Sequence, residues 1–292
     1  MRIGLHLPQW GADATRAGVL EVARAAEAAG LDSLWAADHI VHPLGSASAY
    51  PYRGDGLPFS AEDGFLEAFT TLAAVAGATT RIRLGTSVFV LPMRDPVLTA
   101  KVTATLDVLS SGRLELGVGA GWWAEEFAAV SAPFAGRGER LDEQIDIVRL
   151  LWSGHPVRHA GAAFAFDEVV CRPAPHQRPG PPILVGGMGD RALRRAIERG
   201  DGWHGVGGDP DVLKKGREKL DRLCEEAGRD PRTVRLSTST GLGEDTERLL
   251  RRLESLRGAG VGLAVLNVRQ NTVPATLAAL DRLAADVLPK LW

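Results

Sequence analysis

Short apolar runs alternate with longer helix-like segments along the whole 292-residue chain, and this alternation constrains the fold more than any other feature. The runs contain few polar residues, as expected for strands covered on both faces of a parallel sheet. The predicted strands are Arg2–Leu7, Ser33–Ala37, Ile82–Val90, Arg113–Val118, Pro182–Val185, Gly202–Val206, Thr233–Thr238 and Gly262–Val268. Eight strands alternating with helices predict a (β/α)8 TIM barrel, with a doubly wound open sheet as the alternative.

The segments between these runs carry helix signals. Thr15 stands where a helix N-cap is expected, and Gly30 stands where the helix ends. Between them Val19, Val22 and Ala26 repeat at helical spacing. The last helix is expected to begin near residue 272. Because the chain is long enough for one large core and the alternation runs its whole length, we expect a single domain over residues 1–292.

Two connections are longer than the usual loops of this fold. The first follows the second strand, spans residues 38–65 and contains both tyrosines of the chain, Tyr50 and Tyr52. The second spans residues 153–181, after the fourth strand and its helix, and its alternating pattern suggests an inserted hairpin. Since loops after strand ends build the active site of a barrel, the first insertion is a candidate lid, with a plain surface loop as the alternative.

Composition excludes several classes of protein. No apolar run approaches the roughly 18 residues of a membrane span, and the first residues show no export signal, so we expect a cytoplasmic protein without a membrane partner. The 34 basic residues nearly balance the 36 acidic ones, for a net charge of −2, which argues against nucleic-acid binding. Cys171 and Cys224 are too few for a disulfide framework or a zinc cluster, and no metal site is expected. His6 and His204, inside predicted strands, are expected to line the barrel.

Asp38 and His39 directly follow the second strand, at the end where this fold places catalytic groups. Histidine is the side chain whose ordinary pKa suits proton transfer near neutral pH. His39 is therefore a candidate catalytic residue. The alternative is structural, with Asp38 capping the next turn and His39 bonded to a backbone carbonyl.

Glycines also mark the end of the fourth strand. Gly117, Gly119 and Gly121 resemble part of a dinucleotide-binding fingerprint, but Trp122 stands where that motif needs glycine or alanine. Glycines at a strand exit more commonly allow a flat ligand or a neighbouring backbone to approach closely.

A glycine-rich turn follows the fifth strand. It consists of Gly186, Gly187, Met188 and Gly189, and a helix begins at once after it. Such a turn offers free N–H groups and the positive end of the helix dipole, which predicts a phosphate-binding site. A plain tight turn with Asp190 as helix cap is the alternative.

Together these segments resemble the bacterial luciferase-like monooxygenase superfamily, in particular the branch that uses the deazaflavin coenzyme F-420. The resemblance covers nearly the whole chain, in the order of the predicted strands. Its pieces are residues 2–8, 29–35, 38–39, 84–88, 109–113, 117–122, 172–173, 181–183, 186–187 and 200–203.

The resemblance implies a flavin-type ring inserted edge-on at the carboxyl end of the barrel. Its phosphate would lie near the turn 186–189, and His39 would donate or orient a proton. The implied ring contacts are Asp38, Thr86, Ser87, Val88, Gly119 and Gly121. In this superfamily the third strand often holds a non-proline cis peptide behind the ring, and the matching bond here is Ser87–Val88. An ordinary trans strand is the alternative.

One departure bears on the substrate. Sugar-phosphate dehydrogenases of this family carry a glutamate directly after the glycines of the fourth strand, where this chain has Trp122. The lysines of their phosphate pocket also lack counterparts, so a sugar phosphate is not expected. An apolar substrate between Trp10, Trp122 and the loop of Tyr50 and Tyr52 fits better.

Three functions stay open from the sequence. The first is an oxidoreductase that transfers hydride between coenzyme F-420 and a small organic substrate; the excess of arginine over lysine favours it, because GC-rich genomes more often use the deazaflavin. The second is an FMN-dependent monooxygenase supplied with reduced flavin by a separate reductase. The third is a barrel that binds a flavin without catalysis, against which His39 argues. The family also implies a homodimer.

Overall fold

Eight parallel strands close into a barrel in the computed structural model, which describes residues 1–51, 56–243, 245–269 and 271–291. The barrel strands are β1 (Arg2–His6), β2 (Ser33–Ala36), β3 (Arg83–Thr86), β5 (Leu114–Gly119), β8 (Ile183–Gly186), β9 (Gly202–Val206), β10 (Arg235–Gly241) and β11 (Leu263–Asn267). Strand β1 pairs with β2 and β11, and the ring closes where β3 pairs with β5. The predicted TIM barrel is confirmed, and the open-sheet alternative is wrong.

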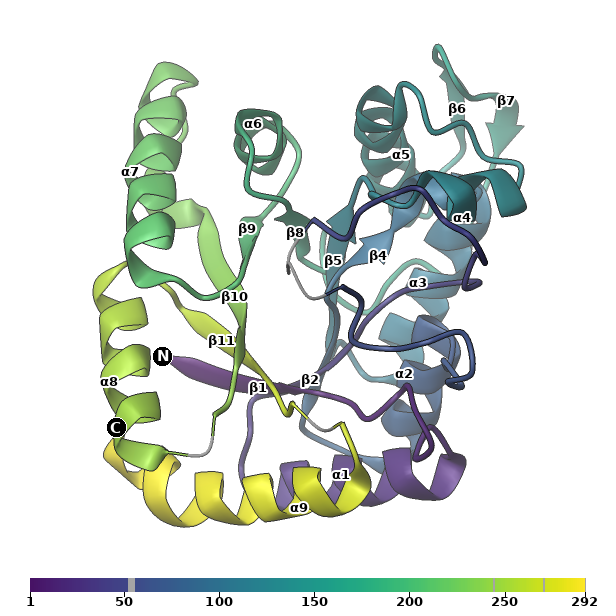
Figure 1. The fold of residues 1–292 in the computed structure, drawn as a ribbon. Helices are drawn as coiled ribbons and strands as arrows, with labels where there is room; N and C mark the ends of the chain where they lie inside the picture. The colour runs from purple at the N-terminus through teal and green to yellow at the C-terminus, as the bar shows by residue number, and fades with distance from the viewer. Residues whose placement is uncertain (52–55, 244, 270, 292) are drawn as a thin grey trace.

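Helices connect the strands and surround them, as Figure 1 shows. They are α1 (Arg16–Ala28), α2 (Ala68–Ala78), α3 (Pro96–Leu109), α4 (Ala124–Ala129), α5 (Arg137–Trp152), α6 (Asp190–Glu198), α7 (Pro210–Glu226), α8 (Thr246–Gly258) and α9 (Val273–Arg282). Thr15 caps α1 by accepting the N–H of Gly18, as expected, and Thr272 caps α9, which begins where it was predicted. Across the described part of the chain, no helix has the length and apolar character needed to cross a membrane.

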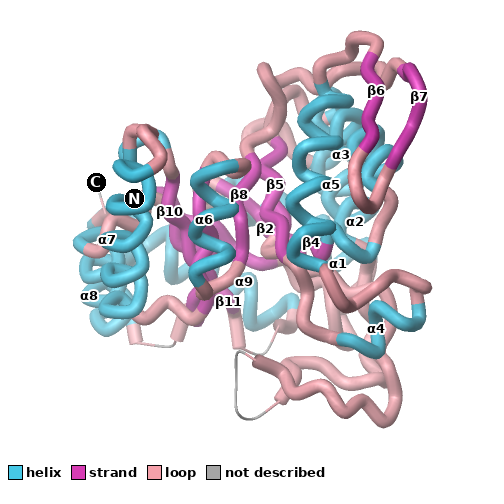
Figure 2. Tube along the Cα trace, turned by 90° about the horizontal axis from the view of Figure 1, so that it is seen from above, coloured by secondary structure: helices cyan, strands magenta, loops and turns pink. Residues whose placement is uncertain are grey.

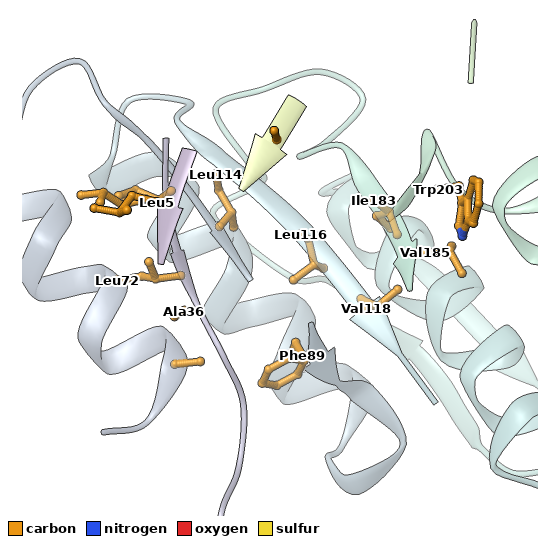
Figure 3. Packing of buried hydrophobic residues seen from close by; sticks show 14 of the residues in the cluster. Leu5, Ala36, Leu72, Phe89, Leu114, Leu116, Val118, Ile183, Val185 and Trp203 are labelled. Carbon is orange, nitrogen blue, oxygen red and sulfur yellow. The ribbon is translucent and has the colours of Figure 1, made fainter. Parts of the chain in front are cut away.

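Outward-facing strand residues form the main core together with the helices. Leu116 and Val118 of β5 and Ile183 and Val185 of β8 belong to it, with Leu72 of α2 (Figure 3). Burial of each such side chain stabilises the fold by roughly 1.5–3 kcal/mol. This layer holds the barrel strands in fixed positions relative to one another.

A smaller core fills the inside of the barrel. Trp35 of β2 is fully buried and stacks on His204 of β9, with ring centroids 5.6 Å apart, although these strands are not neighbours. Space for the indole comes from Gly4 and Gly85, where a Cβ would lie 2.7 Å or less from the nearest side chain. Because side chains fill the middle of the barrel, a ligand can enter only at an end.

Two strands differ from the prediction. The predicted strand 82–90 is split into β3 and a short β4 (Phe89–Val90), because the pairing with β5 shifts by one residue between them, which is a bulge. The predicted strand Thr233–Thr238 begins two residues later, because Pro231 starts a short 3-10 turn that Asp230 caps. The strand also ends later than predicted, at Gly241 instead of Thr238, toward the carboxyl end of the barrel.

The two insertions lie at opposite ends of the barrel. Residues 37–67 connect β2 to α2 at the carboxyl end of the strands, where Trp10 forms an isolated bridge with Phe65. The second insertion contains the expected hairpin, β6 (Val157–Ala160) and β7 (Ala165–Val169). Because the hairpin follows α5 and precedes β8, it lies where strands begin, far from α4 (Figure 2). Only the first insertion borders the barrel mouth.

Candidate active site at the barrel mouth

Inward-facing residues at the carboxyl ends of the strands line the mouth of the barrel. Most of them are small or polar, in contrast to the large indole of Trp35 below them. They are His6, Ala37, Ser87, Gly119, Gly186, Val206, Ser239 and Asn267. This change in side-chain size at the mouth leaves the carboxyl end as the place for a ligand.

His39 follows β2 and is held by a buried carboxylate from another element. Its Nδ1 lies 3.0 Å from Oε2 of Glu126 on α4, and Glu126 is 2% exposed. The other carboxylate oxygen accepts the backbone N–H of Ile40 at 2.6 Å and of Val41 at 3.3 Å. Because a carboxylate can only accept, Nδ1 carries the proton, and Nε2, which has no partner in the described chain, is left for a substrate.

Asp38 is engaged in a different interaction. Its carboxylate accepts two hydrogen bonds from the guanidinium group of Arg94, at 2.6 and 2.7 Å, and one from the N–H of Val90 at 2.7 Å. Burial raises the pKa of Asp38, while Arg94 and Val90 oppose that shift. Asp38 therefore does not cap the turn that directly follows it, and its expected contact with a ring stays a prediction. Asp38 ties the end of β2 to the segment after the bulge.

The bulge at residues 86–88 contains the expected cis peptide bond between Ser87 and Val88. The Thr86 hydroxyl donates to the carbonyl of Gly117 at 2.7 Å, and the Ser87 N–H donates to the carbonyl of Ala36 at 2.8 Å. The bulge is thus bonded to the strands on both of its sides. Of the expected ring contacts here, Thr86 is fully buried, whereas Ser87 and Val88 are partly exposed.

Glycines on two neighbouring strands make room for this bulge. A Cβ at Gly117 would overlap the carbonyl oxygen of Thr86. A Cβ at Gly119 or Gly186 would lie 2.6 or 2.9 Å from the methyl groups of Val88. The glycines at 119 and 186 therefore border the mouth beneath Val88, and Gly121, with φ of 79°, turns the chain away toward α4.

The turn after β8 has the features of an anion site. Gly187 has φ of 118°, and its carbonyl accepts the indole N–H of Trp203 at 2.6 Å. In the described chain, the N–H groups of residues 188–191 donate to no acceptor. They precede or begin α6, whose dipole is positive at this end. Gly186, Gly187, Met188 and Gly189 thus lie beside unbonded N–H groups at a helix N-terminus, and the expected phosphate site stays a prediction. Asp190 begins the helix without capping it.

Aromatic side chains form a wall around His39. Its imidazole lies 5.0 to 6.3 Å, between ring centroids, from four rings. These rings are Phe59, Phe65, Trp122 and Trp123. Trp10 stacks on Phe65, and Tyr50 meets Trp122 edge-on at 5.3 Å. Three of the expected substrate-pocket residues thus join one aromatic cluster with His39, while Tyr52 lies outside the described residues.

A side-chain clasp joins the long insertion to α4. The carboxylate of Glu125 accepts the N–H groups of Ala47 and Ser48, and the indole of Trp123 donates to Ser46 at 2.7 Å. Hydrogen bonding, first from Ser48, lowers the pKa of Glu125 to about 2. The insertion therefore covers one side of the mouth, which fits the expected lid.

His6 and His204 line the barrel as expected, and both are buried. Burial lowers the pKa of His6 to about 3 and that of His204 to about 4, so both imidazoles are neutral at neutral pH. Asn267 donates to the hydroxyl of Ser239 at 2.6 Å, and that hydroxyl lies 3.4 Å from Nε2 of His6. One side of the mouth is thus polar but uncharged.

Sequence reasoning missed Glu126, Arg94 and Gln9. Gln9 joins β1 to the insertion, because its side chain bonds both the N–H and the carbonyl of Ala37 and the carbonyl of Leu66. Two adjacent glutamates shortly after the fourth strand were the available signal for Glu126. Among the described residues, no group of three or more histidine, cysteine or acidic side chains is arranged to hold a metal ion.

Comparisons with known proteins agree with this architecture. A family model described as luciferase-like monooxygenase matches residues 3–280. An uncharacterised protein of Mycobacterium tuberculosis is 44% identical over 211 residues, which is 72% of each chain. A hydroxymycolic acid dehydrogenase of the same organism, named as F-420-dependent, is 32% identical over 215 residues, covering 73% of this chain and 55% of that protein.

A solved structure has the same fold. It is an F-420-dependent secondary alcohol dehydrogenase in complex with an F-420–acetone adduct, with a TM-score of 0.82 and 21% identity. The match covers 100% of this chain and 99% of that one. At this identity the likeness shows the shared barrel alone.

Proposed function

The chain belongs to the luciferase-like monooxygenase family, and on that premise we propose that it is an oxidoreductase that transfers hydride between coenzyme F-420 and a small, mainly apolar organic substrate. The observation that carries the proposal is the hydrogen bond between His39 and Glu126 beside a cluster of aromatic rings. The bulge at residues 86–88 and the turn at residues 186–189, with its unbonded N–H groups, lie at the same mouth. Relatives named as F-420-dependent support the deazaflavin.

The residues at the mouth fit a flavin-type group. The N–H groups of residues 188–191 and the positive end of α6 suit its phosphate, and Ser87 and Val88 present a partly exposed surface for a flat ring. When bound, the deazaflavin supplies a carbon that accepts or donates hydride. The chain then has to place the substrate and move the accompanying proton.

His39 is the group that we assign to the proton. With Nδ1 donating to Glu126, Nε2 is the nitrogen that takes a proton from a substrate hydroxyl, or returns it in the reverse direction. The surrounding rings exclude water and favour an apolar substrate body next to the reacting group. The direction of hydride transfer is left open by this proposal.

Titration of the purified protein with coenzyme F-420 and, separately, with FMN tests the proposal. Binding is followed by fluorescence, and quenching by the deazaflavin at micromolar concentration or below is expected. Tight FMN binding with none for the deazaflavin would instead assign the alternative, an FMN-dependent monooxygenase that needs a separate reductase. If the protein binds a flavin-type cofactor but substitution of His39 changes no measurable reaction, the alternative of a barrel that binds a flavin without catalysis would be supported.

Two further expectations stay predictions, a homodimer and a cytoplasmic location. Leu98 and Leu109 of α3 are 63% and 67% exposed, and the neighbouring Val97 and Val108 are exposed as well, so this helix carries a group of apolar side chains that a partner could cover. Light scattering coupled to gel filtration measures the mass directly. A molecular mass of one chain at micromolar protein concentration would contradict the predicted homodimer.

A further inference from the structure

His204 connects two hydroxyl groups across the inside of the barrel. Its Nε2 lies 2.8 Å from the hydroxyl of Ser87 in the bulge, and its Nδ1 lies 2.8 Å from the hydroxyl of Ser237 on β10. The imidazole is 1% exposed and is held from one side by the stacked indole of Trp35. Ser237 is 2% exposed, whereas Ser87 is partly open at the mouth.

The imidazole is neutral and carries one proton. Its surroundings are the uncharged Trp35, Ser87 and Ser237, with His6 on β1 also neutral. Burial lowers the pKa of His204 to about 4, although the more distant Glu115 opposes this shift. At neutral pH, one ring nitrogen therefore donates a hydrogen bond and the other accepts one.

The hydroxyl of Ser237 decides which nitrogen carries the proton. It has no partner in the described chain other than Nδ1 of His204. If Nδ1 were protonated, Ser237 would accept that bond and its own buried hydrogen would have no acceptor, which is unfavourable. With the proton on Nε2, Ser237 donates to Nδ1 and His204 donates to Ser87, so every buried donor is paired.

We infer that Ser237 and His204 form a relay that fixes Ser87 as a hydrogen-bond donor toward the mouth. Because the Ser87 oxygen accepts from His204, its own hydrogen is available to a ligand. The ligand group that it meets is an acceptor, which for a flavin-type ring means a carbonyl oxygen or an unprotonated ring nitrogen. The identity of this ligand rests on the proposed function. His204 is a positioning residue, since it acts through Ser87.

The tautomer of His204 can be measured without any cofactor. Nitrogen-15 NMR of the histidine-labelled protein near neutral pH reports which ring nitrogen carries the proton. We expect Nε2 of His204 to be protonated and Nδ1 to be bare. In Ser237→Ala the bare Nδ1 loses its only donor, so we expect the preference for this tautomer to weaken. A wild-type His204 protonated on Nδ1 would overturn the relay.

The second test is a double-mutant cycle on cofactor affinity. Ser87→Ala should weaken binding of the ring about tenfold, the effect of one lost hydrogen bond. His204→Phe keeps an aromatic ring stacked on Trp35. It should weaken cofactor binding about tenfold when residue 87 is serine and less than twofold when residue 87 is alanine. Equal effects in both backgrounds would mean that His204 acts by packing, and the relay would be wrong.

Ser239→Ala is the matched control, because this hydroxyl lies on the same strand and faces the same interior but does not contact His204 or Ser87. Its effect on affinity, whatever its size, should be the same with serine or alanine at 87. If His204→Phe does not fold, Ser237→Ala replaces it in the cycle, with a smaller expected loss that again depends on serine at residue 87. A wild type that binds neither F-420 nor FMN sinks the proposed function, while the NMR measurement still decides the relay.

Discussion

The two ends of the barrel interior use polar side chains in opposite ways. At the amino end, Glu115 is 1% exposed, and its carboxylate binds Arg2 at 3.0 Å and Arg83 at 2.7 Å, with Arg235 at 3.9 Å. At the mouth, the polar residues around His204 are neutral imidazoles and hydroxyls. The amino end is closed by a buried carboxylate and the arginines bound to it, whereas the part of the mouth around His204 is lined by uncharged groups.

We expect the polar groups at the amino end to contribute to stability and those at the mouth to contribute to function. Oε1 of Glu115 is bound by arginines of the chain itself, and its Oε2 is buried without a partner among the described residues, so no group at the amino end is presented to a ligand from outside. The mouth keeps unused capacity: Nε2 of His39, the hydroxyl hydrogen of Ser87 and the amides of residues 188–191. A barrel of this kind is expected to place its chemistry at the end with unused donors and acceptors.

Acidification is expected to weaken the mouth first, and this is the largest effect. Burial lowers the pKa of His204 from 6.5 to about 4, and that of His6 to about 3. The unfolded chain therefore takes up protons that the folded chain refuses, so the free energy of unfolding falls as the pH drops from about 6.5 to about 4. The loss for His204 alone is about 3 kcal/mol at most. Urea unfolding at a series of pH values measures it.

The amino end should respond in a lower pH window. Burial opposes ionisation of Glu115, but Arg2 and Arg83 outweigh it and lower the pKa of this carboxyl below its ordinary 4.5. Its stabilisation is thus complete above pH 4.5 and is lost only below it. His204→Gln should reduce the fall in the free energy of unfolding between pH 6.5 and about 4, and Glu115→Gln should not. Wild-type stability that stays constant from pH 6.5 to 4.5 would contradict the neutral histidines.

Glu115→Ala should lower the free energy of unfolding by about 2–4 kcal/mol, because it leaves guanidinium groups unpaired at a buried position. The value lies toward the low end, since the side chains of Arg2 and Arg83 are 35% and 27% exposed and can reach water. Turnover per folded molecule should not change. Arg235→Ala is the control, because this half-exposed side chain lies 3.9 Å away and should cost less than about 1 kcal/mol. If both variants lower the free energy of unfolding equally, the burial of Glu115 does not strengthen its ion pairs.

Most of the fold was predictable from the sequence because strand and helix periods are local. The eight apolar runs, the Thr15 cap and the hairpin in the second insertion are all present. The prediction started β10 too early because it followed the β-propensity of Thr233 and Val234, whereas Pro231 starts a 3-10 turn there. Closure of the barrel followed from the count of strands.

The site was predictable only where its residues follow a strand directly. His39 and the turn 186–189 were found in this way, and they lie at the mouth, whereas Ser87 was expected only from the family resemblance. Glu126, Arg94 and the relay through His204 were not, because each depends on a contact between residues more than 50 positions apart. The role of Asp38 depended on its unseen partner Arg94, since a bound carboxylate and a free one have the same sequence.

His39→Ala should lower turnover by about 10²-fold or more, as expected for loss of a general acid or base, while cofactor affinity and unfolding stay nearly unchanged. His42→Ala is the matched control, because this neighbouring histidine also packs on Phe59 and Trp123 but has no carboxylate partner among the described residues. The control should stay within about threefold of wild type. A loss below about threefold in His39→Ala would leave His39 with a structural role only.

Glu126→Gln should have the smallest effect, about tenfold on kcat with little change in KM for the substrate. The amide oxygen can still accept the N–H groups of Ile40 and Val41, so the loop keeps its position. The amide nitrogen then faces Nδ1 of His39 and favours the tautomer with Nε2 protonated, which cannot accept a substrate proton. Glu125→Gln on the same helix is the control, since Glu125 binds the loop at residues 47 and 48 and does not contact His39. Nitrogen-15 NMR should show the His39 tautomer changed in Glu126→Gln and unchanged in Glu125→Gln. If both variants keep the tautomer and yet lose turnover equally, Glu126 supports the loop, and the mouth holds His39 by packing alone.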